Sequence, residues 1–108
     1  MHLRGKSYRI DAELPDGKRI ELLNVPKFSF NWQLMYVLAE PVHLPAGTVL
    51  HYTATYDNSA ANPLVVQLDT PDREVTYGER TVDEMMGGFV MHTIDAEDLS
   101  RLSARRDR

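Results

Sequence analysis

The sequence contains no cysteine, no long apolar run and no excess of positive charge, and each absence excludes a class of protein. Without cysteine there are no disulfide bridges, no thiolate metal sites and no cysteine nucleophile. No apolar run approaches the roughly 20 residues that a membrane-spanning helix needs. The formal net charge of −4, from 16 acidic and 12 basic side chains, gives no attraction to phosphate backbones or anionic lipid. We therefore expect neither a nucleic acid nor a membrane among the partners of this chain.

Common enzyme fingerprints are also missing. The sequence has no P-loop, no dinucleotide-binding glycine pattern, no Gly-x-Ser-x-Gly elbow and no His-Glu-x-x-His motif. The first residues, 1–7, lack the apolar stretch of a signal peptide. The localisation stays open, because the chain is either cytoplasmic or a piece of a longer exported protein that is periplasmic or extracellular.

The sequence does contain the two-residue alternation that is typical of β-strands. From Ser7 to Leu14, apolar side chains alternate with charged ones. Residues 15–18, Pro-Asp-Gly-Lys, favour a turn, and Arg19–Val25 begins a second apolar run, so the two segments predict a β-hairpin. Further strands are predicted at 34–39, 49–56, 64–68, 74–77 and 89–94.

Length and strand spacing together predict an all-β fold. A chain of 108 residues with 43 % hydrophobic side chains has enough apolar material for one core. Short strands about ten residues apart favour an antiparallel β-sandwich or jelly roll over residues 1–94. Residues 95–108 are predicted to form a short helix and a basic tail, with Asp95 as cap and Ala96, Leu99 and Leu102 on one side. Exposed sheet edges make a homodimer reasonable.

Two other groups of residues have structural interpretations. Trp32, with aromatic neighbours at two-residue spacing, either lines a ligand groove or fills the core, and we prefer the core; the neighbours are Phe28, Phe30 and Tyr36. Asp83 and Glu84 are adjacent, so on a strand they point to opposite faces and do not form a general acid and base pair.

The candidate metal ligands reduce to four histidines, five methionines and the carboxylates. Imidazole combined with thioether suits copper, particularly Cu(I), because thioether sulfur is a soft ligand. His2 lies at the start of the chain and Met85 near its end; by periodicity alone both are more typical of structural positions. The remaining histidines lie on a turn and two predicted strands without ligand spacing: His43, His51 and His92.

The order of several motifs nevertheless resembles one family. His2-x-x-Gly5 opens a strand, a proline and aromatic segment precedes a strand ending in Glu40-Pro41-Val42, and Asp83-Glu84-Met85 precedes the last apolar strand. This order resembles the copper type II, ascorbate-dependent monooxygenases, which include peptidylglycine α-hydroxylating and dopamine β-monooxygenases. The resemblance covers roughly residues 1–94 and is to the C-terminal of their two jelly-roll domains, most closely to bacterial versions attached to larger redox proteins.

The resemblance implies a copper site that is incomplete in this chain. The family holds its oxygen-activating copper with His-x-His-x-x-Gly and with the methionine of Asp-Glu-Met, which match His2, Gly5 and Met85 here. The first histidine would precede Met1, so the resemblance implies an N-terminal truncation or an internal methionine taken as the initiator. The family's second copper has no counterpart here.

Two functional hypotheses follow. In the first, the chain is an isolated copper-monooxygenase-like domain that binds copper weakly through His2 and Met85. It has no catalytic residues of its own and depends on the remainder of a larger redox protein. In the second, it is a non-catalytic β-sandwich module for interaction or ligand binding.

Overall fold

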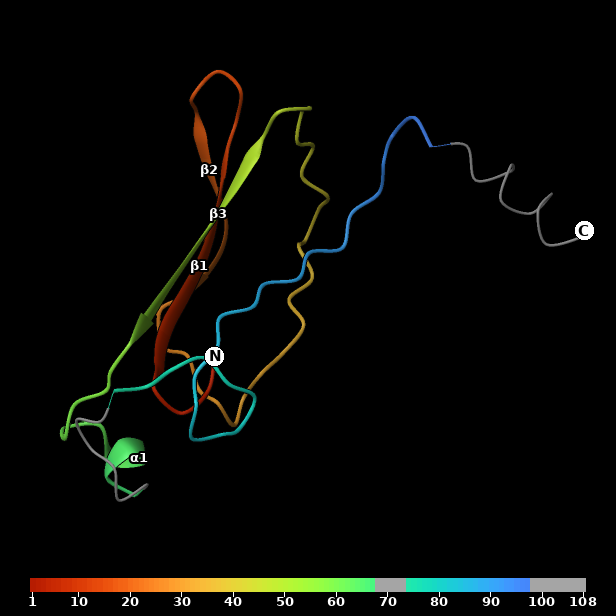
Figure 1. Ribbon diagram of the computed structural model, residues 1–108. Helices are drawn as coiled ribbons and strands as arrows, with labels where there is room; N and C mark the ends of the chain where they lie inside the picture. Colours follow the sequence, from red (N-terminus) through yellow and green to blue (C-terminus); the bar gives the residue numbers. More distant parts are fainter. Residues whose placement is uncertain (68–73, 98–108) are drawn as a thin grey trace, which may run out of the picture.

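The regular structure consists of one antiparallel sheet and one short helix. The computed structural model describes residues 1–67 and 74–97 (Figure 1). The strands are β1 (Gly5–Glu13), β2 (Arg19–Val25) and β3 (Val49–Tyr56), and they lie in the order β2-β1-β3. The helix α1 spans Pro63–Val66. The described part is therefore β-rich with almost no helix, as the all-β class predicts, and its strands form one sheet.

The predicted hairpin of β1 and β2 is confirmed, and its turn has a local cause. Leu14 closes the loop by donating its N–H to the Lys18 carbonyl over 2.8 Å. Gly17 donates to the Leu14 carbonyl over 2.8 Å and has a φ of 84°, a left-handed conformation that glycine adopts without steric cost. This arrangement is a common three-residue hairpin loop.

β1 is the central strand and carries most of the small core. It pairs antiparallel with β3, with Ile10 opposite Tyr52 and Ala12 opposite Leu50. Ile10 and Ala12 are buried, and Val65 of α1 is the third buried apolar residue in the described part of the chain. The predicted strand at 49–56 is therefore confirmed as the second edge of the sheet.

The strand predicted at 64–68 is wrong, because residues 63–66 form α1. Asn62 is the N-cap, and its side-chain oxygen accepts the Leu64 N–H over 3.0 Å. Pro63 occupies the first helical turn, where its missing N–H costs nothing. Asparagine followed by proline is a helix start signal that outweighs the apolar run after it. Residue 68 lies outside the described residues.

Three other predicted strands are also absent from the described residues. Segments 34–39 and 89–94 are irregular and pair with no strand of the described chain, and segment 74–77 makes only an isolated parallel bridge, Tyr77 to Glu84. Trp32 and Tyr36 are 70 % and 49 % exposed, so the predicted core role of these aromatics is wrong here. An alternating sequence forms a strand only when a neighbouring strand satisfies its backbone, and these segments have none.

The predicted C-terminal helix begins as a turn only. Residues 95–96 form the turn, and Glu97 donates its N–H to the Ile94 carbonyl over 2.9 Å. Leu99, Leu102 and the remainder of the predicted helix and basic tail lie outside the described residues. Within the described ranges, no helix has the length and apolar character needed to cross a membrane.

Candidate metal centre

The chain enters β1 through a tight turn that fixes the position of His2. Gly5 donates its N–H to the His2 carbonyl over 3.1 Å. A side chain at Gly5 would put its Cβ 2.6 Å from Cδ1 of Phe28, closer than carbon atoms can approach. The glycine of the His-x-x-Gly motif is therefore required by packing against the segment that follows β2.

The Glu84 carboxylate holds this turn against the far end of the chain. Its Oε2 accepts the His2 N–H and its Oε1 accepts the Arg4 N–H, each over 2.7 Å. Hydrogen bonds to an ionised acceptor are stronger than neutral ones. One side chain thus joins residues about 80 positions apart, and Figure 1 shows the N-terminus against this C-terminal segment.

The His2 imidazole has its proton position set by a backbone group. Its Nδ1 lies 3.0 Å from the Asp83 carbonyl oxygen. A carbonyl only accepts hydrogen bonds, so Nδ1 is the donor in this contact. The edge-to-face contact with Phe30, with ring centroids 5.7 Å apart, holds the ring plane. The His2 ring is therefore held with Nδ1 on the Asp83 carbonyl and with Nε2 on the opposite side of the ring.

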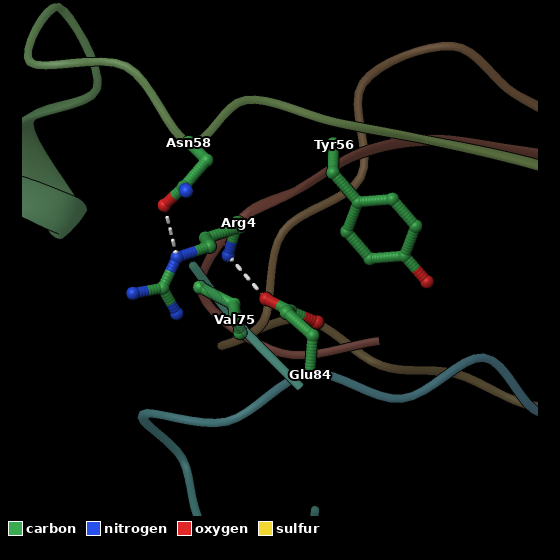
Figure 2. A pocket seen from close by; sticks show the side chains of 5 residues that line it. All are labelled: Arg4, Tyr56, Asn58, Val75 and Glu84. Carbon is green, nitrogen blue, oxygen red and sulfur yellow. Dashed lines mark hydrogen bonds between the residues drawn. The ribbon is translucent and has the colours of Figure 1, made fainter. Parts of the chain in front are cut away.

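Arg4 ties three segments together from a buried position (Figure 2). Its side chain is 1 % exposed; Nε donates to Asn58 Oδ1 over 2.6 Å and Nη1 to the Val82 carbonyl over 2.8 Å. The Arg4 carbonyl accepts the Asp57 N–H over 2.8 Å. Nη2 is buried, and no described residue accepts a hydrogen bond from it. Arg4 and Glu84 also line a pocket of about 320 Å³; its other lining residues are Tyr56, Asn58 and Val75.

The carboxylates of Asp83 and Glu84 bind different partners. Arg80 binds both oxygens of the Asp83 carboxylate, with 2.8 Å from Nε to Oδ2 and 2.8 Å from Nη2 to Oδ1. Gly78 packs against this carboxylate, and a Cβ there would lie 2.6 Å from Asp83 Cγ. These contacts fix the backbone that presents the Asp83 carbonyl to His2.

Met85 follows Glu84 directly and is held by the end of β3. The Tyr56 hydroxyl donates to the Met85 carbonyl over 3.0 Å. Partial burial raises the pKa of the Tyr56 phenol, and the nearby Glu84 charge raises it further, so the phenol keeps the proton that it donates. The structure thus brings the Met85 backbone into the same neighbourhood as His2.

The other histidines lie apart from this site. His43 pairs with Asp95 over 3.1 Å, and His51 Nε2 lies 2.8 Å from Glu13 Oε2. His92 is exposed. Across residues 1–67 and 74–97, no three His, Asp or Glu side chains converge as a metal-binding group.

The sequence did not reveal the residues that position His2 and Met85. Arg4 lies inside the His2-x-x-Gly5 motif, but nothing in the pattern shows that it is buried. Glu84 stands in the Asp83-Glu84-Met85 motif and Tyr56 in the strand predicted at 49–56, but neither pattern indicates the contacts that these side chains make. Their contacts join segments far apart in the sequence, so only the fold reveals them.

Comparisons with known protein families, with curated proteins and with solved structures find no match to this chain.

Proposed function

We propose that this chain is the copper-binding part of a monooxygenase-like protein, with His2 Nε2 and the Met85 thioether as two of the ligands. The chain is not catalytic alone, and its partner is the remainder of a larger redox protein. In this proposal the sheet is one layer of a jelly-roll sandwich. The resemblance of the His2-x-x-Gly5 and Asp83-Glu84-Met85 motifs to the copper type II monooxygenases supports it.

The observation that carries the proposal is the hydrogen bond between His2 Nδ1 and the Asp83 carbonyl. A metal-binding histidine almost always donates its second ring N–H to a carbonyl or carboxylate, which fixes the tautomer and makes the ligating nitrogen more basic. Here the carbonyl belongs to the segment that contains Met85. The two ligand-bearing segments are therefore coupled without any metal.

The chemistry of the two ligands favours copper over other metals. Thioether sulfur binds Zn²⁺ and Mg²⁺ poorly and suits Cu(I), and imidazole is a good copper ligand. By the resemblance, a bound copper would activate dioxygen. The residues of this chain orient the ligands: Glu84 fixes the backbone at His2, and Tyr56 fixes the backbone at Met85. Two protein ligands bind copper only weakly. In this proposal, catalysis therefore needs further ligands from the remainder of the larger protein.

Anaerobic Cu(I) titration against a competing chelator tests the proposal. We expect His2→Ala and Met85→Ala each to weaken Cu(I) binding by about tenfold or more, because each removes a ligand from a site that has few. His92→Ala and Met86→Ala are the matched controls, since they remove the same side-chain types from exposed positions. Equal affinity in all four variants and the wild type would exclude the site.

A second arm of the same titration adds one histidine ahead of Met1. The added residue creates the His-x-His-x-x-Gly spacing of the resembled family. We expect Cu(I) affinity to rise about tenfold or more, because a third ligand joins an oriented pair. No rise would show that the N-terminal turn does not present an added ligand to this site.

A second candidate function is a non-catalytic interaction module. The observation that favours it is the set of large apolar side chains exposed along residues 32–38 and 89–94. This function would be favoured over the first if no variant lost copper binding and the protein associated with a partner through these two segments.

A further inference from the structure

Residues 32–38 and 89–94 lie outside the sheet and carry exposed apolar side chains, and we call these two segments together the apolar flank. Figure 1 shows them, in yellow and in blue, running in the same direction away from the N-terminal site. Beyond the far end of each segment, His43 Nδ1 lies 3.1 Å from Asp95 Oδ2, and this contact links the chain that follows the two segments. At the near end Gly88 lies against the Tyr52 and Tyr8 rings of the sheet.

The side chains of the apolar flank are unusually exposed for their size. Phe89 is 98 % exposed, Val37 84 % and Met91 81 %. Such residues normally lie inside a protein, and contiguous exposed apolar patches of several hundred square ångströms mark interaction sites. The other exposed apolar members are Trp32, Leu34, Met35, Tyr36, Leu38, Val90 and Ile94.

Most of the backbone N–H groups of the apolar flank also lack a hydrogen-bond acceptor in the described part of the chain, although Trp32 donates to the Ser29 carbonyl over 3.0 Å. Within the described residues, no N–H group of residues 34–39 or 89–94 donates a hydrogen bond. Both segments have sequences that favour strands, and a strand-forming segment with unpaired N–H groups is a template for pairing with another chain. The flank therefore offers apolar contact and backbone pairing together.

The molecule as a whole also lacks the burial of a compact domain. Its radius of gyration is 18.8 Å, whereas a compact chain of this length has a radius of about 13 Å. Only Ile10, Ala12 and Val65 are buried apolar residues in the described part. A core of this size contributes little hydrophobic stabilisation, so covering the flank would add to the stability of the fold.

We infer that the apolar flank is covered by the same surface of a second copy of this chain. The exposed fractions correspond to roughly 800 Å² of apolar side chain per copy, which is about what each partner of a stable complex buries. Residues 28–39 and 85–94 contain no Asp, Glu, Lys or Arg, so two copies meet without like-charge repulsion. A two-fold interface pairs one surface with itself, which this flank permits.

Sedimentation velocity over about 1 to 100 µM protein tests the inference, because a dimer of moderate affinity dissociates in that range. We expect the wild type to sediment as a dimer, and Phe89→Asp and Val37→Asp to raise the dissociation constant about tenfold or more. Val49→Asp is the matched control, because it charges an exposed valine at the edge of β3, outside the flank. Far-UV circular dichroism confirms that each variant keeps its sheet, and Phe89→Ser replaces any variant that does not fold.

Hydrogen exchange on the wild type gives an independent readout. The amides of residues 34–39 and 89–94 are expected to gain protection as the concentration rises, while those of the β1–β2 hairpin stay unchanged. A wild type that stays monomeric at about 100 µM overturns the inference and assigns the flank to a strand from another polypeptide. A dimer that is weakened equally by Val49→Asp also overturns it. The inference is independent of copper binding, so failure of one leaves the other standing.

Discussion

At the scale of single residues, the Glu84 carboxylate organises the candidate site. Its two oxygens accept the N–H groups of His2 and Arg4, which lie two residues apart in the entry turn. Both donors are half-buried or buried, so removing the acceptor leaves groups that water does not easily reach. Arg4 adds side-chain bonds to the same assembly, and together these contacts keep the start of the chain from fraying.

Glu84→Gln is expected to lower the free energy of unfolding by about 1–3 kcal/mol, because one carboxylate oxygen becomes an amide NH₂ that faces a backbone donor. The same variant is expected to weaken Cu(I) binding, since the His2 ring loses its fixed position. Urea unfolding and the chelator titration measure the two effects. Glu79→Gln, at an exposed position nearby, serves as control. Equal losses in both variants would show that charge alone, and not the two hydrogen bonds, matters.

At the scale of elements, the segment after Met85 crosses the sheet where glycine leaves room. Gly88 lies so close to the sheet that a Cβ would meet Tyr52 Cδ1 at 2.5 Å. The neighbouring Gly87 has space, because its Cβ would lie 3.8 Å from the nearest atom, in Phe89. The Tyr8 hydroxyl donates to the Gly87 carbonyl over 3.4 Å, and burial raises the pKa of this phenol. The sheet therefore sets the path of residues 86–88.

Gly88→Ala is expected to destabilise the protein by about 1–3 kcal/mol, because its methyl group forces the Tyr52 ring or the backbone to move. Gly87→Ala is the matched control, with an expected change within about 0.5 kcal/mol. Thermal unfolding followed by circular dichroism measures both. A similar loss in the two variants would mean that backbone freedom of the glycine pair, and not contact with the sheet, is the cause.

At the scale of the whole molecule, charged side chains form a row across all three strands. Arg9 of β1 binds Asp11 with 2.7 Å between Nε and Oδ2, and this hydrogen bond is the main cause that lowers the pKa of Asp11. Arg19 of β2 and His51 of β3 both bind the Glu13 carboxylate. The hydrogen bond from Arg19, and then that from His51, lowers the pKa of Glu13. The row thus links β1 to both of its neighbours.

Acid is expected to destabilise the fold through this row. Folding lowers the pKa of the Glu13 carboxyl below its unfolded value, which is near 4.5. The ionised carboxylate therefore stabilises the folded protein at a pH above 4.5. This stabilisation is lost as the pH falls through the lower pKa of the folded state. We expect the melting temperature to fall below about pH 4.5 in the wild type, and to fall less steeply in Glu13→Gln. The same Glu79→Gln variant is the control. If the melting temperature of Glu13→Gln fell with pH as steeply as that of the wild type, this role of Glu13 would be contradicted.

The sequence alone determined the features of this protein whose causes are local. The hairpin of β1 and β2 follows from alternation on both sides of Pro15-Asp16-Gly17, and β3 follows from its β-branched and aromatic residues. The sequence also assigned His2 and Met85 to one hypothetical site, because the order of motifs along the chain can be recognised without knowledge of the fold. By contrast, residues 63–66 became helical where the apolar run predicted a strand, since the Asn62 cap outweighed it.

Only the tertiary structure decided which residues hold the candidate site and which segments stay uncovered. Glu84, Arg4 and Tyr56 gain their roles from hydrogen bonds between distant parts of the chain, and no local pattern encodes such contacts. Segments 34–39 and 89–94 carry strand-like sequences, yet a strand needs a partner to satisfy its N–H and C=O groups. Sequence sets the capacity to form a strand, and the presence of a neighbour decides whether that strand forms.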